Sequence, residues 1–477
     1  MLELDRFYVA GRWVRAQSPE RQVLVDPNTE EPYGSVALAG DADVDAAVAA
    51  AKAAFPAWSA TTPAERVAVV ERMRQVHLQR IDDMAQAISQ EMGAPIDLAR
   101  QAQAGAGPRH MANYLAAMEH FEFVRPLGAH APDDRIALEP TGVAALITPW
   151  NWPISQITLK VAAALLAGCT VVLKPSEMAP LSANVFAGIL DAAGVPAGVF
   201  NLVHGNGAVA GQRLSTHPDI DMVSFTGSTR AGIAITRAAA GSLKRVGLEL
   251  GGKGANIVFA DADDRAVERG VRQCFVNSGQ NCNAPSRMLV ERSVYDRSVE
   301  RAAEVAKSIE VGPSSRPGGH IGPVVSAAQF ARIQGLIDKG VAEGARLVAG
   351  GPGRPAGFNR GFYVQPTVFA DVANDMTIAR EEIFGPVLSI IPFDDEEQAI
   401  AIANDTPYGL TNYVQSQDGE RRNRVARRLR SGMVEMNGQP RGAGSPFGGV
   451  KASGRAREGG RLGIEEFLDV KSISGWA

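Results

Sequence analysis

The chain has 477 residues, of which 45% are hydrophobic and 21% are charged, with 50 glycines and 28 prolines. At about 150 residues per domain this length predicts roughly two to four domains, and the glycine and proline content without a repeat indicates many tight turns. The formal net charge of −4 excludes the strongly basic surface of a nucleic-acid-binding protein, so no nucleic acid is expected as a partner.

The first part of the chain predicts helices and no export signal. Residues 1–7 carry acidic side chains where a signal peptide has a basic start and an apolar run. Residues 41–58 predict an N-capped, alanine-rich helix, and residues 63–92 have apolar side chains at helical spacing. Residues 121–139 fit neither this helical layer nor the strands that follow, and we expect an arm that adds strands elsewhere.

From residue 142 onward, short apolar runs alternate with helical stretches. Strands are expected at 142–148, 170–175, 199–203 and 222–227, and helices near 154–167, 182–193, 207–214 and 229–240. The alternation predicts β-α-β units and a parallel sheet covered on both faces. Such sheets bind ligands beyond the carboxyl ends of their strands, so the motifs at those ends are candidate binding residues.

Residues 141–159 carry no charge and have the length of a membrane span. Pro149 and Pro153 interrupt the stretch and Lys160 follows it at once, so we expect no transmembrane helix and no membrane partner. Without an export signal, a cytoplasmic location is expected.

A second alternation follows residue 252. Strands are expected at 255–259 and 287–291 and near 363–369 and 386–392, with a helix at about 261–277. This pattern predicts a second α/β domain. The last fifteen or so residues do not fit it and are expected to form another arm.

Cys282 is the candidate nucleophile among three cysteines. An odd count too small for a disulfide framework indicates a reducing compartment. Cys282 lies in the polar, turn-forming run GQNCNAPSR, where a reactive thiolate would be accessible. Cys169 beside a strand and Cys274 on an apolar helix face fit ordinary packing roles.

Two further motifs could complete a reaction site. Glu249, in GLELGGK, follows a strand and precedes two glycines, so it is either a general base that projects into a crevice or a simple turn residue. Asn151, in ITPWNWP, either donates a hydrogen bond to a developing oxyanion or caps the following helix.

Other motifs at strand ends suit a nucleotide. Lys174 and Glu177 occur in VVLKPSE, where the acid could bind ribose hydroxyls. Gly227 and Ser228 occur in SFTGST, a strand-to-helix turn that offers N–H groups to a phosphate. The glycine-rich turn at 205–211 is weaker evidence. EEIFGP, with Glu382 and Phe384, and SPFGGVKASG complete the set, and each alone could be ordinary loop chemistry.

Together, in this order, these motifs resemble the NAD(P)-dependent aldehyde dehydrogenase superfamily. The resemblance runs from FYVAGRW near the start to PFGGVKASG near the end. It implies an α/β fold with a Rossmann-like NAD-binding domain, an α/β catalytic domain and β-strand oligomerisation arms. The implied division places the NAD-binding domain at 1–120 and 140–248, the catalytic domain at 249–440, and the arms at 121–139 and 460–477.

The resemblance implies a role for each catalytic residue. Cys282 would attack the aldehyde carbon and form a thiohemiacetal, whose oxyanion Asn151 and the Cys282 N–H would hold. Hydride transfer would leave a thioester, and Glu249 would activate water to release the carboxylic acid. Lys160 and Glu458 match positions that tune the nucleophile or relay protons.

The resemblance implies NAD as the cofactor. Lys174 and Glu177 match adenosine-ribose contacts, and a carboxylate at 177 would repel a 2′-phosphate, which favours NAD over NADP without excluding NADP. Ser228 matches a pyrophosphate contact and Glu382 a nicotinamide-ribose acceptor. The expected cofactor residues are Trp150, Lys174, Ser176, Glu177, Gly207, Gly211, Phe225, Gly227, Ser228, Leu250, Glu382 and Phe384.

Three departures from the family's commoner pattern concern the substrate. Trp152 replaces a phenylalanine, Asn281 and Asn283 flank the nucleophile, and Arg441 stands where an aromatic residue is frequent. The expected substrate pocket comprises Trp152, Gln156, Asn281, Asn283, Arg441 and Phe447. We hypothesise a hydrogen-bonding or anionic aldehyde, such as a semialdehyde, although Arg441 could equally be a solvated loop residue or a subunit contact.

The sequence argues against three rival functions. Glu249 argues against a CoA-acylating or phosphorylating relative, the intact set of Cys282, Glu249 and Asn151 argues against a binding module without chemistry, and no histidine near these motifs could serve a cysteine hydrolase. The expected partners are an aldehyde and like subunits in a homodimer or homotetramer. No residue set indicates a metal.

Overall fold

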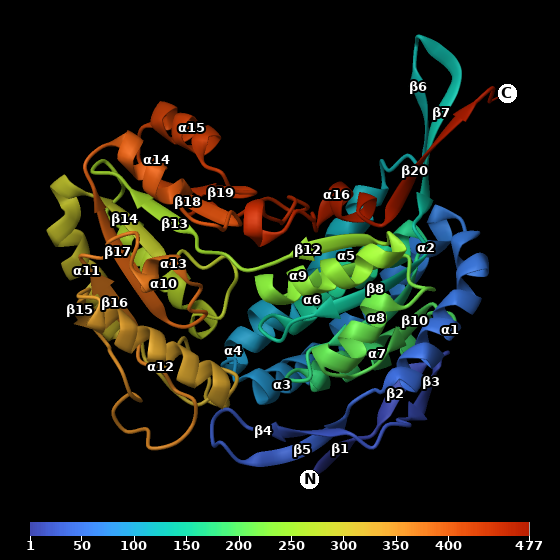
Figure 1. Cartoon of the computed structure of the whole chain (residues 1–477), viewed down its shortest axis with the longest axis horizontal. Helices are drawn as coiled ribbons and strands as arrows, with labels where there is room; N and C mark the ends of the chain where they lie inside the picture. Colours follow the sequence, from blue (N-terminus) through green and yellow to red (C-terminus); the bar gives the residue numbers. More distant parts are fainter. Residues whose placement is uncertain (477) are drawn as a thin grey trace.

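The computed structural model describes residues 1–476, and its two largest sheets lie in opposite halves of the molecule (Figure 1). Each of these sheets has seven strands, and there are two further three-stranded sheets. One three-stranded sheet lies near the N-terminus, and the other projects from the body together with the C-terminus.

The first large sheet has the strand order β12-β11-β8-β9-β10-β2-β3. Its strands are β2 (Arg6–Val9), β3 (Arg12–Arg15), β8 (Val143–Thr148), β9 (Thr170–Pro175), β10 (Phe200–Leu202), β11 (Met222–Thr226) and β12 (Arg245–Glu249). The five from β8 to β12 are mutually parallel, whereas β2 and β3 are antiparallel additions. The carboxyl ends of the parallel strands therefore lie along one edge.

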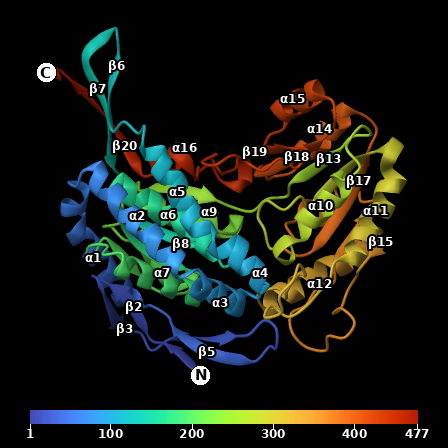
Figure 2. The same cartoon turned by 180° about the vertical axis from the view of Figure 1, so that it is seen from behind.

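Helices cover both faces of this sheet. Those in the connections are α1 (Asp41–Ser59), α6 (Pro153–Ala167), α7 (Pro180–Ala192), a π-helical turn η2 (Gly207–Gly211), α8 (Gln212–Thr216), α9 (Thr229–Ala239) and a 3-10 turn η3 (Ala240–Ser242). A helical layer lies over α6 and α7 (Figure 2) and comprises α2 (Pro63–Gln79), α3 (Ile81–Met92), α4 (Ile96–Leu98), a π-helical turn η1 (Ala99–Ala104) and α5 (Ala106–Met118). The stretch at 63–92 is thus two helices, which separate at Arg80.

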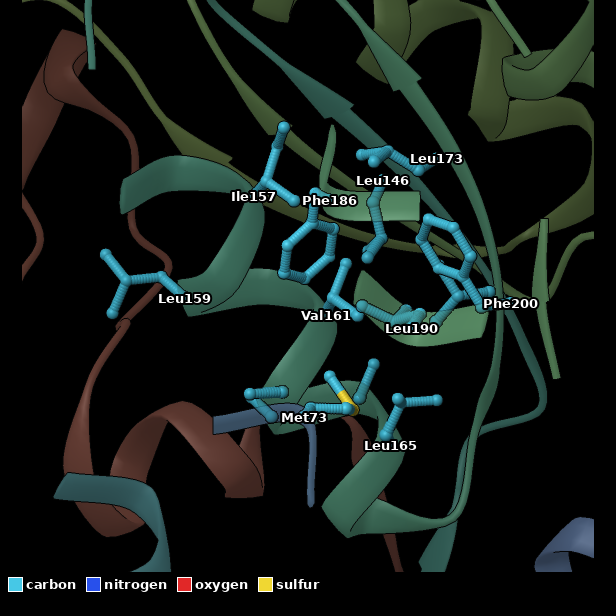
Figure 3. Close-up of a cluster of buried hydrophobic side chains, with 14 of the residues drawn as sticks. Met73, Leu146, Ile157, Leu159, Val161, Leu165, Leu173, Phe186, Leu190 and Phe200 are labelled. Atoms are coloured by element: carbon cyan, nitrogen blue, oxygen red, sulfur yellow. The ribbon is translucent and has the colours of Figure 1, made fainter. Parts of the chain in front are cut away.

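The core of this half fixes the strand ends. Strands β8 and β9 are buried along their whole length, as two-sided burial of a parallel sheet requires. Helix α6 is buried except at Ser155, and Val161 and Leu165 on this helix belong to the same buried cluster as Leu146 and Leu173 of the strands (Figure 3). Such dense packing leaves little freedom to the residues that follow each strand.

The second large sheet has the order β15-β16-β17-β14-β13-β18-β19 and is parallel except for β15 against β16. Its strands are β13 (Ala255–Val258), β14 (Arg287–Glu291), β15 (Arg346–Ala349), β16 (Thr367–Ala370), β17 (Val387–Phe393), β18 (Thr411–Gln415) and β19 (Met433–Met436). The accompanying helices are α10 (Ala266–Phe275), the 3-10 turns η4 (Val276–Gly279) and η5 (Arg292–Val294), α11 (Tyr295–Ser308), α12 (Ala327–Ala342), α13 (Thr377–Arg380), α14 (Glu396–Asn404) and α15 (Gly419–Arg428).

Two predicted boundaries in this half are wrong. The helix expected from about residue 261 begins at Ala266, because the Asp263 side chain accepts the N–H of Arg265 at 3.0 Å and forms a local turn instead. The strand expected near 363 begins at Thr367, after Pro366, which lacks the N–H that a strand interior needs.

The predicted arm segments meet in one antiparallel sheet of order β20-β7-β6, which projects from the body (Figure 1). Its strands are β6 (Val124–Gly128), β7 (Ala131–Pro140) and β20 (Leu468–Ser474). Residues 460–465, also expected in an arm, form helix α16 (Gly460–Glu465), which packs against α5 and α6. The N-terminal sheet is β1 (Leu2–Leu4), β5 (Pro32–Ala37) and β4 (Arg21–Val25), and a 3-10 turn η6 spans Lys451–Ser453. Within residues 1–476, no helix combines the length and apolarity that a membrane crossing requires.

Candidate active site

Cys282 lies at the end of a strained loop between α10 and β14. Asn277 and Ser278 in this loop have positive φ angles of 55° and 56°. Such angles are uncommon for residues with a side chain and cluster at functional sites. Gly279 follows with a φ of 71°, and a Cβ there would lie 2.1 Å from the carbonyl oxygen of Gly385. The position therefore requires glycine, and the loop leaves Cys282 half-buried.

Asn151 lies against the same loop. Its Nδ2 donates a hydrogen bond to the carbonyl oxygen of Gln280 at 3.0 Å, and only 4% of the residue is exposed. The residue that precedes α6 is Trp152, and no side chain caps that helix. The alternative interpretation of Asn151 as a helix cap is therefore wrong. Its second Nδ2 proton is available to a ligand.

Glu249 ends strand β12 and is 1% exposed, yet neither carboxylate oxygen has a hydrogen-bond partner in the protein. Burial raises the pKa of Glu249 well above its usual value, and the negative charge of Glu458 raises it further, against the opposing effect of Lys160. A carboxylate with a raised pKa and no partner can accept a proton from a reacting molecule. Glu249 therefore has the properties of a general base rather than of a turn residue.

A buried ion pair lies in the same region. Lys160 Nζ donates to Glu458 Oε1 at 2.5 Å and to Ser224 Oγ at 3.0 Å, and both charged side chains are almost completely buried. Glu458 also exchanges backbone hydrogen bonds with Phe447, which ties it to the glycine-rich loop at 445–454. The two residues predicted from the resemblance are thus brought together and share one charge-neutral unit.

The surroundings of Cys282 favour the protonated thiol over the thiolate. Burial raises the pKa of Cys282 to about 12, and the negative charges of Glu382 and Glu249 raise it as well, whereas Arg441 opposes them. The thiolate is the reactive form of a cysteine. The thiol proton therefore has to leave before Cys282 can react as a thiolate.

A cavity of about 570 Å³ opens onto Cys282. All six residues of the expected substrate pocket line it. Its further lining includes Arg109, His110 and Asn113 from α5, Ser155 from α6 and Gln273 from α10, none of which the motifs indicated. The sequence signal for these residues is weak, because they lie on helices whose apolar pattern reports only the opposite, core-facing side.

Several polar side chains interrupt the mainly apolar wall of the cavity. Trp152 Nε1 donates to Asn281 Oδ1, and Asn281 Nδ2 donates to the carbonyl oxygen of Val276 at 2.6 Å, so Asn281 braces the wall. Gln156 Oε1 is buried without a partner. His110 Nε2 lies 2.9 Å from Ser155 Oγ. Side chains that lack a protein partner on a cavity wall can bind polar atoms of a substrate.

Arg441 is neither fully solvated nor free. Its Nε donates to Glu435 Oε1 at 3.1 Å, and its guanidinium carbon lies 4.8 Å from the centre of the Phe447 ring. The side chain is 32% exposed. Burial lowers the pKa of His110 to about 4, and the positive charges of Arg109 and Arg441 act in the same direction, which favours the neutral imidazole.

The nucleotide-type motifs lie at the strand ends of the first sheet. Lys174 is the fifth residue of β9, and its buried Nζ donates to the carbonyl oxygens of Pro175 at 2.9 Å and Gly205 at 2.6 Å. Glu177 Oε2 lies 3.7 Å from the same Nζ. Ser176 Oγ accepts the N–H of Met178 at 3.2 Å.

The glycine-rich turn and the start of α9 adjoin this edge. Gly207 and Gly211 bound the π-helical turn η2, and a Cβ on Gly207 would meet no atom within 4 Å, so this backbone is open to a ligand. Ser228 precedes α9, and its Oγ accepts the N–H of Ala231 at 3.3 Å. A Cβ added to Gly227 would lie only 2.4 Å from the Phe225 ring, so the ring occupies the space that a side chain at 227 would need.

A second group lies where the two large sheets meet. Glu382 Oε1 accepts the N–H of Gly252 at 3.0 Å, and burial raises the pKa of Glu382 to about 7. Phe384, with a positive φ of 59°, meets Trp150 edge to face at 5.5 Å between ring centres. Leu250, just after Glu249, is buried and donates its N–H to the carbonyl oxygen of Ser453 at 2.9 Å.

These residues fit a dinucleotide. The open backbone at Gly207, the helix start at Ser228 and the carboxylate of Glu177 supply the contacts that phosphate and ribose require at such an edge. Among residues 1–476, no group of three or more His, Cys, Asp or Glu side chains could hold a metal ion.

A model of the aldehyde dehydrogenase family matches residues 13–473. The chain is 48% identical to 3-succinoylsemialdehyde-pyridine dehydrogenase from a Pseudomonas species, over 100% of this chain and 99% of that protein. The crystal structure of an aldehyde dehydrogenase from Bartonella henselae has 55% identity and a TM-score of 0.99, with 100% of both chains covered. A mutant of aldehyde dehydrogenase C from Pseudomonas syringae, in complex with NAD+ and octanal, has 48% identity and a TM-score of 0.97, covering 99% of this chain and 97% of that one.

Proposed function

The chain belongs to the aldehyde dehydrogenase family, and from that premise we propose that it oxidises an aldehyde to the carboxylic acid through a covalent intermediate on Cys282, with NAD+ as the oxidant. The observation that carries the assignment of residues is the buried Glu249 carboxylate, which has no partner in the protein and lies in the same site as the Cys282 thiol. Burial of a carboxylate without a partner costs folding free energy, and ionisable groups in such surroundings cluster at functional sites. This favours a role for Glu249 as a proton acceptor.

In the first step the Cys282 thiol releases its proton to solvent water, and Sγ attacks the aldehyde carbon. The new C–S bond leaves a negative charge on the former aldehyde oxygen. The free Nδ2 proton of Asn151 and the Cys282 N–H are the donors proposed to stabilise it. Because the Gln280 carbonyl fixes the Asn151 amide, the donor is already oriented when the charge develops.

The residues proposed to hold the cofactor are Trp150, Lys174, Ser176, Glu177, Gly207, Gly211, Phe225, Gly227, Ser228, Leu250, Glu382 and Phe384. When bound, NAD+ supplies the acceptor for the hydride that leaves the thiohemiacetal carbon. The Glu177 carboxylate disfavours the additional 2′-phosphate of NADP. Phe384 and Trp150 form an aromatic wall that can exclude water from this part of the site.

Deacylation requires a water molecule and a base. Glu249 takes a proton from water, the hydroxide adds to the thioester carbon, and the C–S bond breaks to release the carboxylic acid. The two charges of the Lys160–Glu458 ion pair act on the pKa of Glu249 in opposite directions. We propose that the pair thereby keeps the electrostatic surroundings of Glu249 nearly constant while this residue gains and loses its proton.

We propose a polar aldehyde, such as a semialdehyde, as the substrate class. The support is the cavity wall, where the Gln156 amide oxygen has no partner and Arg441, His110 and Asn283 present polar groups. The name of the Pseudomonas relative, a semialdehyde dehydrogenase, points in the same direction. A cavity of about 570 Å³ also has room for substrates larger than a four-carbon aldehyde.

The domain division and the assembly are proposed from the strand topology. We propose residues 1–120 and 140–248 as the NAD-binding domain, 249–440 as the catalytic domain, and 121–139 with strand β20 (Leu468–Ser474) as the oligomerisation arms. The free edges of the β20-β7-β6 sheet support assembly as a homodimer or homotetramer. A cytoplasmic location is part of the same proposal and is supported by the unpaired cysteines.

The test is NADH formation with a panel of aldehydes. Cys282→Ala should abolish turnover, because the nucleophile is lost. Glu249→Gln should leave a burst of NADH followed by slow release, because acylation proceeds while hydrolysis lacks its base. Full steady-state activity in either variant would refute the mechanism.

A further inference from the structure

Gln103 is far from Cys282 in sequence, but a chain of side-chain amides joins it to the candidate active site. It is fully buried in the π-helical turn η1. Its Nε2 donates to Oδ1 of Asn277, 174 positions later, at 3.1 Å, and also contacts the sulfur of Met92 at 3.6 Å. No motif marked Gln103, and π-helical turns are rare elements that occur frequently at functional sites.

Asn277 connects Gln103 to Asn151. Asn277 Nδ2 donates to the backbone oxygen of Asn151 at 2.9 Å, and Asn151 Nδ2 donates to the backbone oxygen of Gln280 at 3.0 Å. The circuit closes where Gln280 Nε2 donates to the backbone oxygen of Asn277 at 3.2 Å. All four residues are 4% exposed or less. The circuit therefore sets the place of Asn151 relative to the loop that carries Cys282.

The direction of the Gln103 bond determines the orientation of Asn277. A side-chain amide has one donor end and one acceptor end. While Gln103 donates to Oδ1, the donor end of Asn277 faces the Asn151 carbonyl. An acceptor at position 103 would attract Nδ2 instead and turn Oδ1 against that carbonyl. Because two oxygen acceptors repel each other, Asn151 would leave its position.

We propose that Gln103 is a positioning residue for the reaction: it orients the Asn277 amide, which holds Asn151 where its own amide can bind the oxyanion formed at Cys282. Gln103 acts only through Asn277, since it does not line the cavity around Cys282. The inference rests on the roles proposed above for Asn151 and Cys282. It also explains why two residues with side chains occupy the left-handed region at 277 and 278: the circuit and the bond from Ser278 Oγ to the Gly322 carbonyl hold them there.

The test compares Gln103→Glu, which keeps the shape and offers only acceptors once its carboxyl group has ionised, with Gln103→Met, whose thioether cannot donate a hydrogen bond. Because burial raises the pKa of a carboxyl group, the rates of all variants are compared at a pH high enough to ionise position 103. Gln101→Met, an exposed position on the same turn, is the matched control. The measurement is single-turnover NADH formation by the full-length chain in saturating excess over hexanal, with NAD+ present. Loss of one oxyanion donor slows enzymes by about 100- to 1,000-fold, so we expect a slowing of about 100-fold for Gln103→Glu and about 10-fold for Gln103→Met. Gln101→Met should react at the wild-type rate.

At saturating enzyme this rate constant does not depend on the fraction of molecules that is folded, so a purely structural role would leave it unchanged. A wild-type rate in Gln103→Glu, or a rate no lower than that of Gln103→Met, would overturn the proposal. If Gln103→Glu does not fold, Gln103→Met decides, alone and combined with Asn151→Ala. In that double variant Gln103→Met should lower the rate constant less than about twofold below that of Asn151→Ala alone, because both changes act on one interaction. A further loss as large as that of Gln103→Met in the wild-type chain would contradict the proposal. A wild-type chain that forms no NADH with any aldehyde would overturn the proposed function itself.

Discussion

Arg441 meets three neighbours at the cavity, the Glu435 carboxylate, the Phe447 ring and the sulfur of Met433. Glu435 contacts only one of its nitrogens, so guanidinium N–H groups remain for a ligand. A carboxylate-bearing substrate would form a half-exposed ion pair there. Such pairs contribute about 1 kcal/mol or less, because solvent screens them.

The substrate proposal therefore predicts a modest, selective effect of Arg441→Ala. We expect kcat/KM for a carboxylate-bearing aldehyde to fall about fivefold relative to a neutral aliphatic aldehyde of the same length, the factor that corresponds to about 1 kcal/mol. Arg441→Met is the control, because it keeps an apolar stem against Phe447 and removes only the charge. An unchanged preference in both variants would contradict an anionic substrate.

At the same scale, the sequence identified side chains better than their bonds. Glu249 and Asn151 stand out because they are polar residues at the ends of apolar strands, and Cys282 because it lies in a polar, turn-forming run beyond a helix. Gln103 gave no such signal, since a lone glutamine on a helix is indistinguishable in sequence from a solvated one. The Lys160–Glu458 bond joins positions 298 apart, and only the folded arrangement brings them together.

Among the elements, the link between α3 and α7 depends on one carboxylate. Glu91, in the last turn of α3, accepts the N–H of Leu181 at 2.6 Å and that of Ser182 at 3.2 Å, in the first turn of α7. These N–H groups have no partner within their own helix. Burial raises the pKa of Glu91 to about 8 in spite of the hydrogen bonds, which lower it.

This raised pKa predicts how stability varies with pH. The folded state binds the Glu91 proton more tightly than the unfolded state, whose pKa is near 4.5, so the contribution of Glu91 is fully present below pH 4.5 and is lost as the pH rises through about 8. Relative to Glu91→Gln, which cannot ionise, the wild-type chain should lose melting temperature across that interval. Differential scanning calorimetry of both proteins measures it. A constant difference between them would show that Glu91 does not titrate in this range.

Element prediction succeeded where one physical pattern dominated. The strands at 143–148 and 170–175 are continuous buried runs, which only a covered parallel sheet explains. It failed where local side-chain bonds competed with the apolar pattern, as at Asp263 before α10. It also could not foresee the π-helical turn at 99–104, which has no distinctive composition. The cavity residues of α5 were missed for the related reason that its periodicity reports its buried face.

For the whole molecule, the arm sheet is the feature that a single chain does not explain. Val470 on β20 is 73% exposed, and β6 is exposed along most of its length. We predict that Val470→Lys converts the wild-type oligomer into a smaller species in sedimentation velocity, because a charge would be placed in the proposed subunit contact. Val23→Lys, at an exposed position on β4, is the control. A monomeric wild-type protein, or an unchanged assembly in Val470→Lys, would contradict the proposed role of the arms.

The Lys160–Glu458 pair has a consequence for the order in which the protein is made. The first large sheet is complete once Glu249 has left the ribosome, and α6 with Lys160 belongs to its core. The carboxylate that neutralises this ammonium is synthesised only 298 residues after it, and the last arm strand later still. Because an unpaired ammonium is costly to bury, we expect Lys160 of the nascent first half to stay solvated or deprotonated until Glu458 is available. The Lys160–Glu458 ion pair can therefore form only after residue 458 has been synthesised.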